Sequence, residues 1–187
     1  MPSVYTIIAY WSWVLIFLFW LPGHFTAKKT IERPNPIGRT VAMIFIIAGF
    51  FFLFSNPRNA TILLTPQTTG FGIIGLVIDL ASAAFAIWAR LTIGSNWANV
   101  VSLKEGHELV QSGPYAIVRH PIYTGFLFAA LGTALTIGSL YAYLGVIVLL
   151  VGMLIRIRDE DALMAKQFPA EHPVYRARVK RLVPFIW

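Results

Sequence analysis

Residues 126–155 read FLFAALGTALTIGSLYAYLGVIVLLVGMLI and contain no charged side chain. A membrane helix needs about 20 apolar residues, and this region is covered by two apolar segments, 124–138 and 141–155. Only Ser139 and Leu140 separate the two segments, which predicts an antiparallel pair of helices. A run without charge cannot form a water-facing surface, so the chain is expected to fold in lipid.

Three further apolar segments precede this pair, at 5–22, about 41–54 and 70–88. No basic residue precedes the first segment and no small-residue cleavage site follows it, which predicts a retained membrane helix rather than a signal peptide. The 187 residues are 57% hydrophobic and 12% charged, whereas soluble domains carry about 25% charged residues. The sequence therefore predicts an all-α, polytopic membrane protein with about five transmembrane helices.

The net charge of +7 is distributed unevenly along the chain. Four of the 15 basic residues lie within 23–40 and ten lie from Arg90 onward, while only Arg58 lies between the second and third segments. With the N-terminus outside, five crossings place 23–40, 89–123 and the C-terminal tail on the inner side, as the positive-inside rule requires. We therefore predict a cationic cytoplasmic face that contacts anionic membrane lipids, and no nucleic-acid partner.

The last stretch, 156–187, changes character and reads RIRDEDALMAKQFPAEHPVYRARVKRLVPFIW. We expect a charged continuation of the fifth helix, breaks at Pro169 and Pro173, and then an amphipathic C-terminal segment. Residues 185–187 would enter lipid, while the Arg and Lys cluster before them would face the headgroups.

Several smaller features admit a structural interpretation. The GFGIIG stretch at 70–75 has G-x-G-x-x-G spacing but lacks a βαβ context and an acidic residue about 20 positions further on, so we interpret it as close helix packing. Asp79, near the middle of the third segment, either contacts a substrate or pairs with a hydroxyl of a neighbouring helix.

His107 and His120 lack metal-ligand spacing, so no metal is predicted. Arg119 alone fits an interfacial anchor.

The region 104–123, KEGHELVQSGPYAIVRHPIY, gathers charged and aromatic side chains. A solvated loop needs only polarity, whereas Pro114 and Pro121 restrict the backbone and indicate a fixed geometry.

Beyond the last apolar segment, Arg156 and Glu160 are four residues apart on one helix face. They form either an intrahelical ion pair or two separate ligand groups, Glu160 for a cationic cofactor and Arg156 for an anionic substrate.

The chain resembles the isoprenylcysteine carboxyl methyltransferase family, whose wider group includes membrane phosphatidylethanolamine methyltransferases. The resemblance rests on LVQSGPYAIVRHPIYTGFL, the hydrophobic pair of helices and FPAEHPVYRARVKRLVPFIW, and it runs from about residue 95 to the C-terminus. The family pattern R-H-P-x-Y-x-G corresponds to 119–125, and the H-x-L-V-x-S-G-x-Y element begins at His107. The family's Glu-Glu pair corresponds to Glu160 and Asp161, so the second acid is shorter here.

The resemblance implies one integral-membrane methyltransferase domain over 1–187, with N-terminal helices in 1–92 and a cofactor-binding core in 95–187. It implies S-adenosyl-L-methionine as the cofactor, bound without a Rossmann fold. Arg156 matches the position that contacts the methyl-accepting substrate, which makes it the expected catalytic and substrate-binding residue. By motif position, the expected cofactor-binding residues are His107, Glu108, Leu109, Val110, Tyr115, His120, Pro121, Ile122, Tyr123 and Glu160.

The activity implied is methylation of the carboxylate of a lipophilic, isoprenylcysteine-like substrate, at the cytoplasmic side of a bacterial or archaeal inner membrane or of the endoplasmic reticulum. A carboxylate is already ionised, so catalysis would depend mainly on orientation. A phospholipid amine or another lipophilic amine is an alternative acceptor, which needs His120 or Asp161 as a base. A sterol-reductase-like NADPH oxidoreductase and a non-catalytic membrane scaffold are further alternatives, although 187 residues are few for the reductase architecture.

Overall fold

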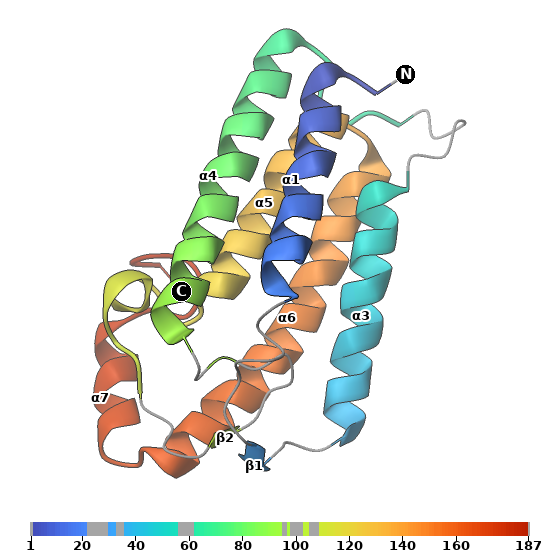
Figure 1. Cartoon of the computed structure of the whole chain (residues 1–187). Helices are drawn as coiled ribbons and strands as arrows, with labels where there is room; N and C mark the ends of the chain where they lie inside the picture. The colour runs from blue at the N-terminus through green and yellow to red at the C-terminus, as the bar shows by residue number, and fades with distance from the viewer. Residues whose placement is uncertain are drawn as a thin grey trace.

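Five apolar helices run alternately in opposite directions in the described part of the chain (Figure 1). The computed structural model describes residues 2–21, 30–32, 36–55, 62–94, 97, 103–104 and 109–186. α3, α4 and α6 are long and apolar enough to cross a membrane, while α1 and α5 are apolar helices of 17 residues. The predicted all-α, polytopic membrane fold is confirmed. The bounds are α1 Val4–Trp20, α3 Pro36–Phe54, α4 Thr69–Ile93, α5 Pro121–Ile137 and α6 Leu140–Gln167.

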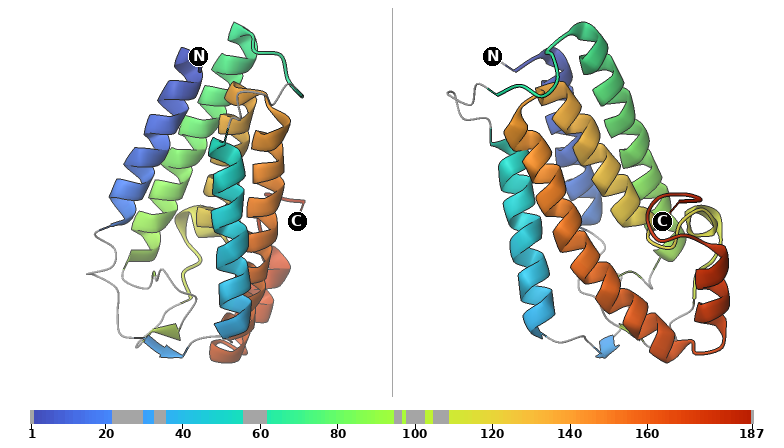
Figure 2. Two further views of the ribbon diagram at one scale, coloured as in Figure 1. Left: turned by 90° about the vertical axis from the view of Figure 1, so that its right-hand side faces the viewer. Right: turned by 180° about the vertical axis from the view of Figure 1, so that it is seen from behind.

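The short elements gather at one end of the bundle, where α1, α4 and α6 finish and α3 and α5 begin (Figure 2). β1 (Thr30–Glu32) and β2 (Leu103–Lys104) form a two-stranded antiparallel sheet that the sequence analysis did not predict. η2 (Gly113–Ala116) is one 3-10 turn, and α7 (Glu171–Arg178) follows α6. This end therefore holds η2, which lies between α4 and α5 in the sequence, and the residues after α6.

Proline accounts for two features of the helix boundaries. The apolar segment at about 41–54 is short for a membrane helix, and α3 adds flanking residues back to Pro36, because a proline fits the first turn of a helix, where its missing N–H is not needed. Pro173 was expected to break the chain, but it lies in the first turn of α7 for the same reason. The break expected at Pro169 is confirmed, since α6 ends with Phe168 as its C-cap residue.

Glycines let the helices approach in two close pairs. A Cβ atom on Gly132 of α5 would lie 2.5 Å from the backbone nitrogen of Asp79, and one on Gly75 of α4 would lie 2.6 Å from the carbonyl oxygen of Gly132. The packing interpretation of GFGIIG is therefore confirmed at Gly75. α3 and α6 meet similarly, because a Cβ atom on Gly145 would lie 2.7 Å from the carbonyl oxygen of Gly49.

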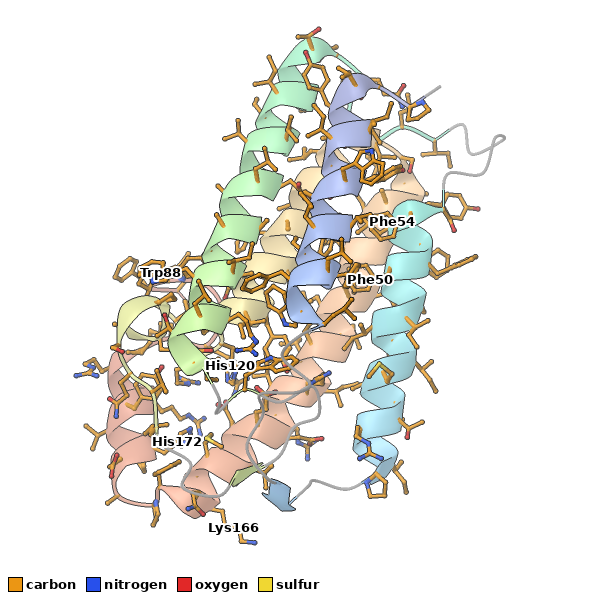
Figure 3. The ribbon with its side chains drawn as sticks, in the orientation of Figure 1. Phe50, Phe54, Trp88, His120, Lys166 and His172 are labelled. Carbon is orange, nitrogen blue, oxygen red and sulfur yellow. The ribbon has the colours of Figure 1, made fainter. Side chains whose placement is uncertain are left out.

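α1 connects the two pairs through the buried side chain of Trp13. Its ring centroid lies 5.1 Å from that of Phe50 on α3, which is labelled in Figure 3, and 5.9 Å from that of Phe126 on α5. The indole N–H donates a hydrogen bond to Oγ1 of Thr133 at 2.9 Å, so the polar end of this buried ring has a partner.

Asp79 lies fully buried in α4 and accepts two hydrogen bonds from neighbouring helices. The donors are the hydroxyl of Ser12 on α1, at 2.5 Å, and the hydroxyl of Thr133 on α5, at 3.0 Å. Of the two interpretations left open by the sequence, the structure shows the pairing with hydroxyls. Because a buried polar group is costly without partners, this cluster fixes the register of three helices.

Candidate active site

The site is built around the start of α5, which the local sequence fixes. Pro121 occupies the first position of α5, where its restricted φ is already helical, and His120 is the N-cap residue. Tyr123 follows three residues after His120, and the centroids of the two rings are 6.0 Å apart. Figure 3 shows His120 close to the bundle end where the short elements gather.

The side chains of His120 and Tyr123 both contact Glu160 of α6. The Tyr123 hydroxyl donates to Oε1 of Glu160 at 2.5 Å, and Nδ1 of His120 lies 3.3 Å from Oε2. The Glu160 side chain is 26% exposed, whereas that of the adjacent Asp161 is only 10% exposed. Since an ionised carboxylate has about four acceptor sites, Glu160 retains capacity to accept hydrogen bonds from a ligand.

His120 is held between two carboxylates. Its Nε2 atom lies 3.0 Å from Oδ1 of Asp161, and its Nδ1 atom lies 3.3 Å from Oε2 of Glu160. Both ring nitrogens donate only when the imidazole is protonated. Burial opposes protonation, but the hydrogen bonds to Asp161 and Glu160 outweigh it and raise the pKa of His120 above its ordinary value of 6.5. This geometry favours a buried imidazolium.

Asp161 contacts several basic side chains around the site. Its Oδ2 atom lies 3.2 Å from NH2 of Arg181 and 3.6 Å from NH2 of Arg119, and its Oδ1 atom lies 3.8 Å from Nε2 of His172. Arg119 is 8% exposed and donates to the carbonyl oxygen of Val179 at 2.6 Å. The interpretation of Arg119 as an interfacial anchor was therefore wrong, because its guanidinium is directed into the protein.

The C-terminal return segment, residues 179–186, lies across the start of α5. The backbone N–H of Arg119 donates to the carbonyl oxygen of Lys180 at 2.8 Å. The hydroxyl of Thr124 donates to the carbonyl oxygen of Leu182, also at 2.8 Å. These bonds attach the end of the chain to the R-H-P-x-Y-x-G stretch, so the site is assembled from α5, α6 and this segment together.

Arg156 lies one helical turn before Glu160 in α6. Its guanidinium carbon is 5.8 Å from the centroid of the Tyr123 ring, which is within the range of a cation–π contact. The structure thus brings Arg156, Tyr123, Glu160 and His120 to one place, although 33 residues separate Tyr123 from Arg156.

Tyr115 of η2 belongs to the same neighbourhood. Its carbonyl oxygen accepts a hydrogen bond from the hydroxyl of Tyr175 at 2.6 Å. Burial raises the pKa of the Tyr115 phenol, and the negative charge of Glu160 raises it further. Burial likewise raises the pKa of Tyr175, to about 12.

Other residues that were predicted to bind the cofactor lie next to the cluster of His120, Tyr123 and Glu160 along the chain. Leu109 and Val110 are half-buried in the chain just before η2, while Pro121 is buried and Ile122 half-buried in the first turn of α5. Two predicted residues, His107 and Glu108, lie outside the described residues.

No role was predicted for His172, and that of Asp161 was left open. Arg181 belongs to the Arg and Lys cluster that was expected to face the headgroups, but its guanidinium contacts Asp161 instead. His172 is 3% exposed on α7, below His120 in Figure 3, and faces the same carboxylate as Arg181. Both residues lie within FPAEHPVYRARVKRLVPFIW, which carried part of the family resemblance. Their joint attachment to Asp161 depends on a fold in which α7 and the return segment turn back toward α5.

Comparisons with known proteins agree on one family. The model of the isoprenylcysteine carboxyl methyltransferase family matches residues 73–166. Over 123 residues the chain is 33% identical to the protein-S-isoprenylcysteine O-methyltransferase of Schizosaccharomyces pombe, covering 64% of this chain and 50% of that protein. Over 129 residues it is 32% identical to the Homo sapiens protein of the same name, covering 64% and 43%. The chain thus spans about half the length of these curated relatives.

A solved structure has the same fold. It is that of a eukaryotic intramembrane Ras methyltransferase, an isoprenylcysteine carboxyl methyltransferase. It matches with a TM-score of 0.57 at 22% sequence identity and covers 83% of this chain and 55% of that chain. The family match extends from α4 to the charged end of α6 and includes Tyr115, His120, Tyr123, Arg156 and Glu160.

Proposed function

Because the chain belongs to the isoprenylcysteine carboxyl methyltransferase family, we propose that it is an integral-membrane, S-adenosyl-L-methionine-dependent methyltransferase. Its acceptor is the carboxylate of a lipophilic, isoprenylcysteine-like substrate. The observation that supports this best is that Tyr123 contacts both a partly exposed carboxylate, Glu160, through its hydroxyl, and a cation, Arg156, through its ring.

The side chains present fit the charges of the cofactor. S-adenosyl-L-methionine carries an ammonium group and a sulfonium group, and when bound it supplies an electrophilic methyl group. The Glu160 carboxylate offers acceptor sites for the ammonium, and His120 and Tyr123 hold that carboxylate in one orientation. The faces of Tyr123 and Tyr115 suit a cationic group. His107 to Val110 complete the expected binding region.

Arg156 suits an anionic acceptor. A guanidinium binds a carboxylate through two parallel hydrogen bonds and so fixes the direction of the attacking oxygen. Orientation of this kind accelerates transfer by removing the entropy cost of alignment. Arg156 needs no change of protonation state for this role, and the acceptor needs no general base because it is already ionised.

The hydrogen bonds of His120 and Asp161 favour a carboxylate acceptor over an amine. An amine must lose a proton, and these two residues are the bases expected for that step. His120 has both ring nitrogens directed at carboxylates, and Asp161 faces Arg119, Arg181 and His120. A base must be able to reach the proton that it removes, and neither side chain is free to do so.

The cytoplasmic face of the membrane is the proposed location of the site. The basic residues are concentrated in the sequence after α1, α4 and α6, and these three helices finish at the end of the bundle where the site lies. The positive-inside rule supports a cytoplasmic position for that end. Depending on the cell, the membrane is a bacterial or archaeal inner membrane or the endoplasmic reticulum.

Calorimetric titration of the protein in nanodiscs tests the cofactor. S-adenosyl-L-methionine should bind saturably and NADPH should not. Glu160→Gln should weaken binding by about 10- to 100-fold, as expected for the loss of a charged hydrogen bond, while Asp159→Asn serves as the matched control. NADPH binding alone would favour the reductase alternative, and binding of neither ligand to folded protein would favour a scaffold.

The acceptor is tested separately by following methyl transfer to a prenylated cysteine. Its carboxylate form should be methylated, whereas its carboxamide and phosphatidylethanolamine should not. Transfer to phosphatidylethanolamine but not to the carboxylate would establish the amine alternative and overturn the assignment of Arg156.

A further inference from the structure

The end of the chain turns back toward the membrane after α7. Leu182 belongs to a buried cluster with Met153 and Ile157 of α6, and Val183 and Leu150 pack against that cluster. Met153 precedes Glu160 by seven residues, which is about 10 Å along a helix, and it lies in the apolar part of α6. Figures 1 and 2 both show the return segment rising from α7 to the level of the last turns of α4.

The tip of this segment is apolar and exposed. Phe185 is 91% exposed and Ile186 is 76% exposed, although the residues just before them pack on membrane-spanning helices. Phe185 also has φ at 65°, and no other non-glycine residue in the described ranges has a positive φ. A bulky residue rarely adopts this conformation, and here it directs an aromatic ring away from the protein.

The cationic side chains near the apolar tip are placed as a bilayer surface requires. Arg178, the last residue of α7, and Lys180, at the beginning of the return segment, are both exposed. Cations that precede a short aromatic and aliphatic tip match a bilayer surface, where anionic headgroups lie above acyl chains.

We propose that the C-terminal return segment is inserted into the bilayer surface, with Phe185 and Ile186 among the acyl chains and Arg178 and Lys180 at anionic headgroups. The segment is then attached on one side to the candidate site, through Arg181 and Asp161, and on the other side to lipid. This proposal does not depend on the identity of the cofactor or the acceptor.

The chain has no cysteine, so a single spin label tests the proposal directly. Phe185→Cys and Ile186→Cys are labelled in separate variants and reconstituted in nanodiscs of phosphatidylcholine with phosphatidylglycerol. Ile147→Cys, at an exposed apolar position of α6, is the lipid reference, and Glu171→Cys, at the start of α7, is the water reference. Collisions with oxygen, which concentrates in lipid, are compared with collisions with a water-soluble nickel chelate.

Labels at 185 and 186 should behave as the label at 147 does, with frequent oxygen collisions and few nickel collisions. Replacing Arg178 and Lys180 with glutamine should bring both labels closer to the water reference when phosphatidylglycerol is present. Nickel collisions as frequent as at 171 would overturn the proposal. Low collision rates with both reagents would also overturn it, because they would mean that a second copy of the chain covers the segment.

Discussion

The Nε2 atom of His120 lies 3.0 Å from Oδ1 of Asp161, and this contact links the start of α5 to the charged end of α6. Through the same carboxylate, Arg181 attaches the C-terminal return segment to both helices. Asp161 is therefore a positioning residue that orients His120, while Glu160 is the carboxylate that remains accessible to a ligand.

Asp161→Asn should destabilise the protein and loosen the return segment. Removing one partner of a buried ion pair costs on the order of 3 kcal/mol, because the remaining cations lose their counter-charge. Thermal unfolding in detergent and hydrogen exchange of residues 179–186 measure the two effects. Asp159→Asn, which makes the same chemical change two residues earlier, should leave both unchanged, and equal effects of the two variants would contradict the role of Asp161.

Arg156→Gln should reduce methyl transfer while largely preserving cofactor binding. Loss of a charged hydrogen bond to the acceptor corresponds to about a 10- to 100-fold decrease in kcat/KM. Parallel kinetics and calorimetry separate the two effects, with Arg158→Gln as the exposed control on the same helix. Turnover at the wild-type rate would mean that Arg156 contributes only a charge at the membrane boundary.

Stability should fall as the pH rises above neutrality, because the pKa of His120 is raised in the folded protein. Below the ordinary value of 6.5, both the folded and the unfolded protein carry the proton, and the contacts with Glu160 and Asp161 contribute in full. Between 6.5 and the raised pKa this contribution declines, and above the raised pKa it is lost. Thermal unfolding between about pH 6 and 9 should show this decline, and His120→Gln should flatten it; an unchanged slope would exclude His120 as its source.

Gly132→Ala should separate α4 from α5. The added methyl group would lie 2.5 Å from both the backbone nitrogen of Asp79 and the carbonyl oxygen of Gly75, and overpacking of this kind costs about 1–3 kcal/mol. Gly70→Ala is the control, because its Cβ atom would meet only the Thr68 hydroxyl oxygen, at 3.9 Å. Thermal unfolding of both variants in detergent should show a loss of stability only at position 132.

The residues of the candidate site could be predicted from the sequence more fully than the contacts between them. The R-H-P-x-Y-x-G stretch and Glu160 were recognisable as motifs, and the structure brings His120, Tyr123 and Glu160 into contact. The motifs did not indicate that both nitrogens of His120 face carboxylates. That arrangement depends on the rotation of α6 about its axis, which helix packing sets.

The sequence by itself determined that the chain folds in lipid, because long runs of apolar residues without charge have no other stable environment. It also indicated a fixed backbone geometry just before the last two apolar segments, since Pro121 restricts the backbone locally, although α5 begins at Pro121 itself rather than at residue 124, where the first of these segments starts. Only the tertiary structure decided which partners Asp79 and Asp161 have, because a buried charge is stabilised by groups from other helices that proximity along the chain does not reveal. The path of the return segment was decided in the same way, by hydrogen bonds from the backbone N–H of Arg119 and the hydroxyl of Thr124, which lie about 60 residues earlier in the chain.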